Sequence, residues 1–519
     1  MNNDNLYAVL AAGFGAAADV AIETPRRSYS WRDVEEGSAR YAHLLQRLGL
    51  RVGDRVLVQA EKSPASLLLY LGVLRAGMVY LPLNTAYREA EVAYFAEDAE
   101  PALMVCGPDQ REWMRALADR TGAAHVLTLD ADGEGSLAQE AAQLPGGFDT
   151  VARAADDLAA ILYTSGTTGR SKGAMLSHGN LASNARVLHG YWGWRSDDVL
   201  LHMLPIFHVH GLFVAAHGAL LAGARMIWLP KLDVEQAVHY LPRCTVMMGV
   251  PTYYVRLLDE ARFDAGLCRN MRLFVSGSAP LLVETFETFR KRTGHVILER
   301  YGMSETVMLT SNPCHAEHGA RIAGTVGRPL PGVRVRVVGD DGAGLPPGSI
   351  GHIQVQGPNV FSGYWRMPEK TREAFTMDGW FDTGDMGCWG EAEGQAGAIP
   401  APDDYLSIVG RSKDLIISGG YNVYPKEVEL AIDELPGVRE SAVIGVPHRD
   451  FGEAVVAVVV PRAGATLDAS ALLARLKSCL AGFKLPKHVA VVDELPRNTM
   501  GKVQKNALRE AYRDCLQDG

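Results

Sequence analysis

The chain has 519 residues, of which 47% are hydrophobic and 21% charged, and this length predicts at least two domains with their own cores. The formal net charge of -9 argues against a general electrostatic hold on nucleic acid or on an anionic membrane, so we expect small-molecule partners. Seven cysteines, odd in number and without a C-x-x-C pair, predict neither a disulfide framework nor a zinc site.

The amino-terminal segment carries acids where a signal peptide would carry a basic region, and we therefore expect a cytoplasmic protein. The most apolar stretch is SLLLYLGVLRAGMVYLPL, residues 66–83, which Arg75 and two glycines interrupt. This pattern predicts a buried helix that leads into a strand, and no segment that crosses a membrane.

Three later segments share one form, in which a short β-rich apolar run leads through a polar loop into a stretch with helical periodicity. The apolar runs and their loops are AAILYTSGTTG (159–169), TVMMGVPTYY (245–254) and RLFVSGSAP (272–280). This alternation is typical of an α/β fold, in which ligands bind beyond the carboxyl ends of the strands. We therefore expect the polar loops to form the site.

The pattern changes near residues 390–404, where GEAEGQAGAIPAPDD predicts a surface excursion. Beyond it, SAVIGV, VVAVVV and HVAVVDEL predict strands, while ALLARLKSCL and KNALREAYRD predict helices, which together suffice for a compact second domain. We expect an α/β protein with a large N-terminal domain of layered sheets and helices over 1–410. A hinge at 411–414 would join it to a small, mobile α+β domain over 415–519.

The stretch LYTSGTTGRSKGAMLSHGN, residues 162–180, combines glycines, hydroxyl side chains and Lys172. Glycines let the backbone turn tightly and approach a ligand, while hydroxyls and a cation bind phosphate oxygens. The stretch does not fit G-x-x-x-x-G-K-[ST], so a P-loop kinase or GTPase is disfavoured. It predicts a different kind of phosphate-binding loop, with a flexible polar loop as the alternative.

Five further motifs follow in a fixed order: FVSGSAP, LERYGMSET, GWFDTGD, IVGRSKDLIISGGYNVYPKEVE and LPRNTMGK. With them the chain resembles the adenylate-forming acyl-CoA synthetases over nearly its whole length. The resemblance implies a two-step reaction that uses ATP, Mg²⁺ and coenzyme A. A carboxylate attacks the α-phosphate of ATP to give acyl-AMP and pyrophosphate, and the thiol of coenzyme A then displaces AMP.

The resemblance also assigns catalytic roles by motif position. Lys502 would be the adenylation lysine, with a solvated lysine in a C-terminal loop as the alternative. A cation between two anions that must meet stabilises the transition state more than the ground state. Lys413 would lie at the hinge, and His208 would contact or gate the acid at the entrance of its pocket. His210 has no such match, and a histidine in an apolar run is more often part of the core.

The other implied roles concern the nucleotide, the metal and coenzyme A. Glu305 and Thr164 would hold Mg²⁺, while Gly419 and Gly420 would line the tunnel for coenzyme A. The residues expected to bind ATP are Thr164, Ser165, Gly166, Thr167, Thr168, Gly169, Lys172, Ser278, Ala279, Pro280, Tyr301, Gly302, Ser304, Thr306, Asp385 and Arg411.

The identity of the acid depends on fewer residues. A helix that begins at Pro251 places Arg256 one turn beyond Thr252, where a guanidinium could bind a second carboxylate, although a solvated arginine is the alternative. His208, Ser278 and Met303 complete the expected acid site. Within the superfamily the chain most closely resembles the malonyl-CoA synthetases, notably at AGMVYLPLNTAY and GPNVFSGYWRMPEKT. This implies malonate as the substrate and methylmalonate as a second candidate.

Three alternatives remain open. The first is a ligase for a monocarboxylic medium-chain or aromatic acid, and the second is a stand-alone adenylation enzyme that loads a carrier protein. A non-catalytic nucleotide sensor is disfavoured, because it would not need Lys502 beside Glu305 and Asp385. We expect no nucleic-acid or membrane partner, and the sequence does not indicate an oligomeric state.

Overall fold

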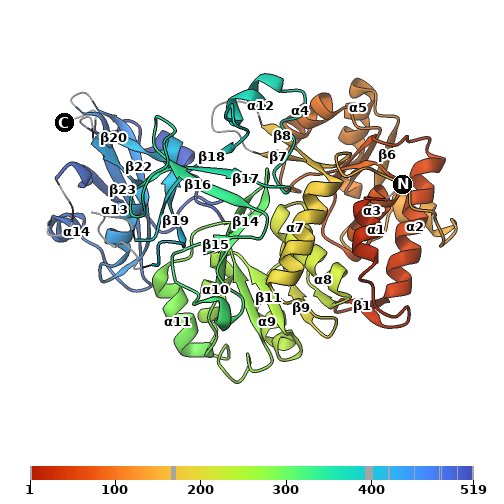
Figure 1. Cartoon of the computed structure of the whole chain (residues 1–519), viewed down its shortest axis with the longest axis horizontal. Helices are drawn as coiled ribbons and strands as arrows, with labels where there is room; N and C mark the ends of the chain where they lie inside the picture. Colours follow the sequence, from red (N-terminus) through yellow and green to blue (C-terminus); the bar gives the residue numbers. More distant parts are fainter. Residues whose placement is uncertain are drawn as a thin grey trace. The chain divides into compact units, whose positions relative to one another are not determined.

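The computed structural model describes residues 3–164, 171–391, 401–418, 421–448, 451–477, 480, 482–498 and 501–516. They form two compact units (Figure 1). The first comprises Met1–Arg321, Pro329–Arg334 and Gln356–Gly379, and the second comprises Ile322–Arg328, Val335–Val355 and Trp380–Gly519.

The first sheet of the first unit has six strands in the order β6-β5-β3-β4-β7-β8, parallel except for the β7–β8 hairpin. Its strands are β3 (Arg55–Gln59), β4 (Val79–Pro82), β5 (Leu103–Cys106), β6 (His125–Thr128), β7 (Leu158–Thr164) and β8 (Lys172–Ser177). The helices along this part of the chain are α2 (Trp31–Arg47), α3 (Pro64–Arg75), α4 (Glu89–Ala99), α5 (Arg111–Thr121) and α6 (Ser136–Ala142).

The buried helix and strand predicted for residues 66–83 are confirmed as α3 and β4. Helix α3 is buried almost all round, which explains why its sequence lacks a polar face. Ser63 and Ser66 cap its start reciprocally, and Arg75 ends it with hydrogen bonds to Glu35 O (2.9 Å) and Phe148 O (2.7 Å). Among the described residues, none of the helices combines the length and apolar character needed to cross a membrane.

The second sheet has the order β15-β14-β13-β12-β11-β9-β10-β1-β2, in which β15 is the short strand Arg328–Pro329. Its strands are β1 (Val20–Glu23), β2 (Ser28–Ser30), β9 (Val199–His202), β10 (Arg225–Trp228), β11 (Val246–Gly249), β12 (Leu273–Ser276), β13 (Leu298–Met303) and β14 (Val307–Ser311). The helices are α1 (Leu6–Ala11), α7 (His178–Tyr191), the π-helix η2 (His210–Ala216), α8 (His217–Ala222), α9 (Val234–Tyr240), α10 (Pro251–Leu258), α11 (Val283–Thr293) and α12 (Pro368–Ala374). From β1 to β13 the strands pair in parallel, so the loops after β9, β11, β12 and β13 share one edge.

The second unit contains two sheets (Figure 1). One has the order β16-β17-β18-β19, formed by β16 (Arg334–Val338), β17 (Gly351–Gln356), β18 (Phe381–Trp389) and β19 (Leu406–Arg411). The other has the order β21-β20-β23-β22, with β24 beside β23. Its elements are β20 (Ile416–Ser418), β21 (Tyr421–Val423), α13 (Pro425–Asp433), β22 (Val438–His448), β23 (Gly452–Pro461), α14 (Ala469–Leu476), β24 (His488–Val491) and α15 (Lys505–Ala511).

Strand β23 is buried on both faces of its sheet, which explains the continuous apolar run VVAVVV. Val455, Ala457 and Val459 pack in one core with α13 and α14, while Val456 and Val458 pack in another with Leu508 of α15. The α/β fold with a small α+β part is confirmed, as are the strands and helices predicted after residue 404. The hinge at 411–414 stays a prediction, and most of the excursion at 390–404 lies outside the described residues.

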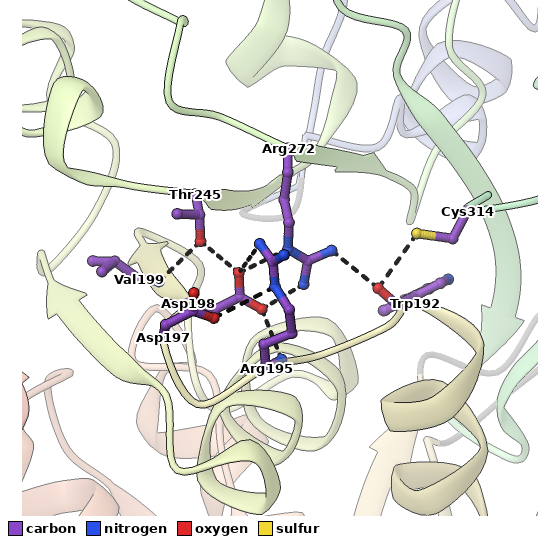
Figure 2. A network of polar contacts seen from close by, with 8 residues as sticks. All are labelled: Trp192, Arg195, Asp197, Asp198, Val199, Thr245, Arg272 and Cys314. Atoms are coloured by element: carbon purple, nitrogen blue, oxygen red, sulfur yellow. Dashed lines mark hydrogen bonds and ion pairs between the residues drawn. The ribbon is translucent and has the colours of Figure 1, made fainter. Parts of the chain in front are cut away.

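A buried ion pair ties together the amino ends of three parallel strands in the first unit (Figure 2). Asp198 is 1% exposed and accepts from Arg272 Nε (2.7 Å) and Nη2 (2.5 Å), and from Thr245 Oγ1 (2.7 Å). These residues stand just before β9, β12 and β11. Burial raises the pKa of Asp198, but the hydrogen bonds from Arg272 and Thr245 outweigh it and hold that pKa below its usual value.

Replacement of Arg272 by leucine should therefore destabilise the fold. The substitution leaves the buried carboxylate without its two guanidinium bonds, which costs about 3–5 kcal/mol in comparable pairs. Urea denaturation at pH 7 measures the loss. Arg195→Ala is the matched control, because that side chain is 57% exposed and lies 3.9 Å from Asp198 Oδ1. It should lower the free energy of unfolding by about 1 kcal/mol or less.

The same pair predicts a pH dependence. The pKa of Asp198 is lowered in the folded state. The carboxylate therefore adds to the free energy of unfolding above the ordinary aspartate pKa, and this addition is lost as the pH falls through the folded-state pKa. The stability difference between the wild type and Arg272→Leu should therefore shrink in acid. A difference that stays constant down to pH 3, or equal losses in both variants at pH 7, would contradict the assignment.

Candidate functional site

The loop after β12 brings a serine against the π-helix that follows β9. Ser278 adopts a left-handed backbone with φ of 69°, and its Oγ lies 3.3 Å from His210 Nδ1. His210 begins η2, and its backbone N–H donates to His208 Nδ1 at 3.4 Å. The predicted residues His208 and Ser278 are thus joined through His210 at the carboxyl edge of the sheet.

His210 is fully enclosed. Burial lowers its pKa well below the ordinary value, and the positive charge of Arg300 adds to this effect. The ring is therefore neutral at neutral pH. Its Nε2 has no hydrogen-bond partner among the described residues.

The segment that carries both histidines is held by a buried lysine. Lys62 Nζ donates to His202 Nδ1 (2.8 Å), His202 O (2.9 Å) and Leu229 O (2.7 Å), and it lies 4.5 Å from the ring centroid of Trp228. His202 Nε2 in turn lies 2.9 Å from Gly211 O of η2. These contacts fix the end of β9 and the start of η2 relative to each other.

The interpretation of the sequence missed Arg300, which lies in the middle of β13. It is only 4% exposed, and its Nε and Nη2 atoms are buried without a partner among the described residues. Burial lowers its pKa to about 9, so the guanidinium still carries its charge at pH 7. The available signal was the single cation in LERYGM, where it directly follows Glu299.

Gly277 makes room for this guanidinium. A Cβ atom at Gly277 would lie 2.4 Å from Arg300 Cζ, closer than any side chain can approach. Besides burial, Tyr254 also affects the pKa of Arg300. Tyr254 is fully buried, and its Oη donates to Val275 O at 2.6 Å. The positive charge is therefore enclosed by β12, α10 and η2 without a carboxylate among the groups that shift its pKa.

The predicted acid ligand Arg256 has a different environment. Helix α10 begins at Pro251 as expected, but the Arg256 side chain is exposed. Burial raises the pKa of its neighbour Tyr253, and the charge of Arg256 lowers it. The role of Arg256 in binding the acid stays a prediction.

The hairpin of β13 and β14 carries the residues expected around the nucleotide. Tyr301 is buried, and Gly302 is required because a Cβ there would lie 1.8 Å from Val307 O. Met303 and Ser304 are half-buried, and Thr306 is fully buried with a hydroxyl that has no partner among the described residues. Ala279 is half-buried and Pro280 exposed in the preceding loop. Their contacts with ATP remain predictions.

Glu305, Lys172 and Thr164 lie in one neighbourhood. Glu305 Oε1 accepts from Tyr364 Oη at 3.1 Å, and Lys172 Nζ lies 4.1 Å from the centroid of the Tyr364 ring. Burial lowers the pKa of Lys172, while the charge of Glu305 raises it. Thr164 Oγ1 donates to Lys172 O at 3.4 Å across the β7–β8 hairpin. The oxygen donors expected for Mg²⁺ are thus near the cation expected for phosphate.

Helix α4 is bonded to β7 and to the residue just before β8. Tyr163 Oη donates to Asp98 Oδ2 at 2.5 Å, and Tyr94 Oη donates to Ser171 O at 2.7 Å. The predicted loop residues Ser165, Gly166, Thr167, Thr168 and Gly169 lie outside the described residues, as do Gly419 and Gly420.

The remaining predicted residues belong to the second unit. Asp385 of β18 is buried and pairs with Arg411 of β19, whose Nε lies 3.0 Å from Asp385 Oδ1. Lys413 follows two residues later, and burial and the charge of Arg411 lower its pKa. Lys502 is exposed on a turn before α15. Within the described part of the chain, no group of three or more His, Cys, Asp and Glu side chains is arranged to hold a metal ion.

Gly277→Ala tests the enclosure of Arg300. The added methyl group must displace the guanidinium, and overpacking of this kind costs about 1–3 kcal/mol. Chemical denaturation measures the loss. Gly190→Ala is the control, because that exposed helical glycine has nothing within 4 Å of a Cβ, and the change should stabilise the fold by about 0.5–1 kcal/mol. Equal effects of the two substitutions would contradict the enclosure.

Known proteins are similar to this chain in sequence and fold. Residues 12–365 match the model of the AMP-binding enzyme family, and residues 427–502 match that of the AMP-binding enzyme C-terminal domain. The malonate–CoA ligase of Arabidopsis thaliana is 33% identical over 98% of this chain and 89% of its own length. A feruloyl-CoA synthase of an Amycolatopsis species is 35% identical over 95% of this chain and 96% of its own.

Among solved structures, ATP-bound MatB from Rhodopseudomonas palustris is similar with a TM-score of 0.94 and 54% identity. The likeness covers 99% of this chain and 100% of MatB. The matched ranges contain the motifs that carry Glu305, Arg300 and Lys502. The chain belongs to the AMP-binding enzyme family and has its adenylate-forming fold.

Proposed function

We propose that the protein is an ATP-dependent malonate–CoA ligase, which forms malonyl-AMP and pyrophosphate and then transfers the malonyl group to coenzyme A. Membership of the AMP-binding family supports the adenylate step. The name of the Arabidopsis relative supports malonate, while the feruloyl-CoA synthase shows that sequence identity alone does not choose the acid. The observation that carries the choice is the enclosed charge of Arg300, whose Nε and Nη2 atoms have no hydrogen-bond partner among the residues that the structure describes.

A second carboxylate on the substrate would pair with the charge of Arg300. Malonate presents one carboxylate that reacts and a second that loses its hydration when it is buried in the site. A guanidinium can bind this second carboxylate through two parallel N–H···O hydrogen bonds. Arg300 offers buried Nε and Nη2 donors without partners among the described residues. A monocarboxylic acid would leave this charge buried and unpaired, which is strongly unfavourable. Methylmalonate has the same two carboxylates and is the second candidate substrate.

Neutral His210 suits the same task. It adds no second positive charge, and Ser278 lies beside it with a hydroxyl that can donate to a carboxylate. We propose that His208, Ser278 and Met303 line the acid site together with Arg300, and that Arg256 approaches the acid from its exposed position on α10.

On the nucleotide side, Lys172 would bind the β- and γ-phosphates and Asp385 the ribose hydroxyls. A carboxylate can accept from two hydroxyls at once. Glu305 and Thr164 would hold Mg²⁺, whose preference for oxygen ligands fits this donor set, and the ion would neutralise phosphate charge. Lys413 would lie at the hinge, and Lys502 would bring the carboxylate and the α-phosphate together.

We also propose a cytoplasmic location. The widely spaced, odd-numbered cysteines support a reducing compartment, because a secreted framework would be expected to pair them.

A panel of acids tests the substrate. With ATP, Mg²⁺ and coenzyme A, pyrophosphate release should be faster with malonate than with butyrate, benzoate or ferulate by at least about a hundredfold in kcat/KM. Detection of malonyl-CoA from free coenzyme A separates the ligase from an enzyme that loads only a carrier protein. Faster turnover with butyrate or benzoate would overturn the choice of malonate.

Arg300→Leu tests the proposed ligand of the second carboxylate. Malonate use should fall by about a hundredfold or more in kcat/KM, since the second carboxylate loses its partner, while butyrate use should not fall. Arg256→Ala should reduce malonate use more than butyrate use, but less than Arg300→Leu, because Arg256 is exposed. Arg243→Ala is the control. Arg243 lies before β11 and forms an ion pair with Glu23, so its loss should not select between the two acids. Equal losses with malonate and butyrate would exclude either arginine as the selective ligand.

Lys502→Ala should separate the two half-reactions. Loss of one preorganised donor to the developing charge costs about a hundredfold or more, so malonate-dependent pyrophosphate release should nearly vanish. Conversion of supplied malonyl-AMP to malonyl-CoA should persist, because that step does not bring two anions together. Loss of both steps to the same extent would contradict this role.

A further inference from the structure

We propose that Arg497 and Asn498 are positioning residues that fix the turn carrying Lys502, and that Glu440 of β22 is the anchor for this turn. The inference rests on the proposed role of Lys502 in adenylation. The Lys502 side chain is exposed, and its backbone is bonded on both sides.

Asn498 closes the turn. Its backbone N–H donates to Lys502 O at 2.9 Å, and its Oδ1 accepts from the backbone N–H of Lys502 at 2.9 Å. Its carbonyl accepts from the N–H of Gly501 at 2.9 Å, and Gly501 has φ of 74°, which favours glycine. One residue thus satisfies both peptide groups of Lys502 and the peptide N–H before it.

Arg497 joins this turn to the sheet. Its Nη1 donates to Gly501 O at 2.6 Å, and its Nη2 forms an ion pair with Glu440. Arg497 and Val503 are also partners in an isolated antiparallel bridge. A planar guanidinium can hold two acceptors in fixed directions, so the position of Glu440 on β22 determines that of the Gly501 carbonyl.

The chain beyond the lysine is anchored as well. Gln504 N–H donates to Pro496 O at 2.8 Å, and Lys505 Nζ lies 2.6 Å from Glu429 of α13. The turn therefore has a fixed base on both sides.

The rigidity of this turn matters because the proposed adenylation step depends on the position of the Lys502 ammonium group. A long side chain samples several rotamers, and a rigid backbone limits the volume that these rotamers cover. Displacement of a reacting group by about 1 Å can cost about a hundredfold in rate. We call Arg497, Asn498 and Glu440 the clamp around Lys502. The clamp would affect the rate of adenylation without itself contacting ATP or the acid.

The test compares half-reactions in the full chain. Arg497→Ala should lower kcat for malonate-dependent pyrophosphate release by about tenfold to a hundredfold, with little change in KM for ATP or malonate. Conversion of supplied malonyl-AMP should keep the wild-type rate. Arg497→Lys should recover part of kcat by restoring the charge beside Glu440. Arg439→Ala is the matched control, because Arg439 also contacts Glu440, at 3.1 Å, but forms no hydrogen bond or ion pair with the described residues of the turn.

A second pair of variants addresses folding. Asn498 is exposed, so its substitution should leave the thermal midpoint unchanged. Asn498→Ala removes the acceptor for the Lys502 N–H and should lower kcat for adenylation, whereas Asn498→Asp keeps an oxygen there and should retain more of it. Wild-type adenylation in Arg497→Ala and Asn498→Ala, or equal losses in both half-reactions, would overturn the inference. Normal adenylation in Lys502→Ala would instead overturn the role of Lys502 itself.

Discussion

A positive charge that is buried without a carboxylate partner in the described part of the chain is the constraint on which the proposed acid site depends. Strand β13 buries Arg300, and Gly277 leaves the space that its guanidinium occupies. Burial lowers the pKa of this group to about 9 without removing its charge at neutral pH. A ligand that supplies a carboxylate there recovers the interaction, and a ligand that lacks one does not.

The amino ends of three neighbouring strands carry a buried charge that is fully paired. Before β9, β11 and β12, the carboxylate of Asp198 is bonded to Arg272 and Thr245, and it holds the strands together (Figure 2). Elsewhere in this sheet, Arg300 within β13, Thr306 after β13 and His210 after β9 keep buried polar atoms without partners among the described residues. Buried polar groups are normally satisfied, so these three residues are candidates for contact with a ligand. The stability of the sheet and the reactivity of its edge thus come from separate polar clusters.

Much of this could be predicted from the sequence. Periodicity and apolar runs identified α3, β4 and β23, since burial determines those patterns, and Pro251 marked the start of α10. The strand β8 was not anticipated, because its short segment follows directly on the glycine-rich loop. Motif order indicated Glu305 and Lys172, which do lie together. Arg300 was missed because a single residue in a strand does not reveal whether its charge is paired, and the clamp around Lys502 depends on contacts that only the folded chain makes.

The most direct test compares malonate with its monomethyl ester in the exchange of labelled pyrophosphate into ATP, without coenzyme A. The ester keeps the reacting carboxylate and nearly the same shape, but it carries no second negative charge. If Arg300 selects the acid, malonate should support exchange and the ester should be slower by at least about a hundredfold. Exchange at similar rates with both compounds would show that the buried guanidinium does not choose the substrate.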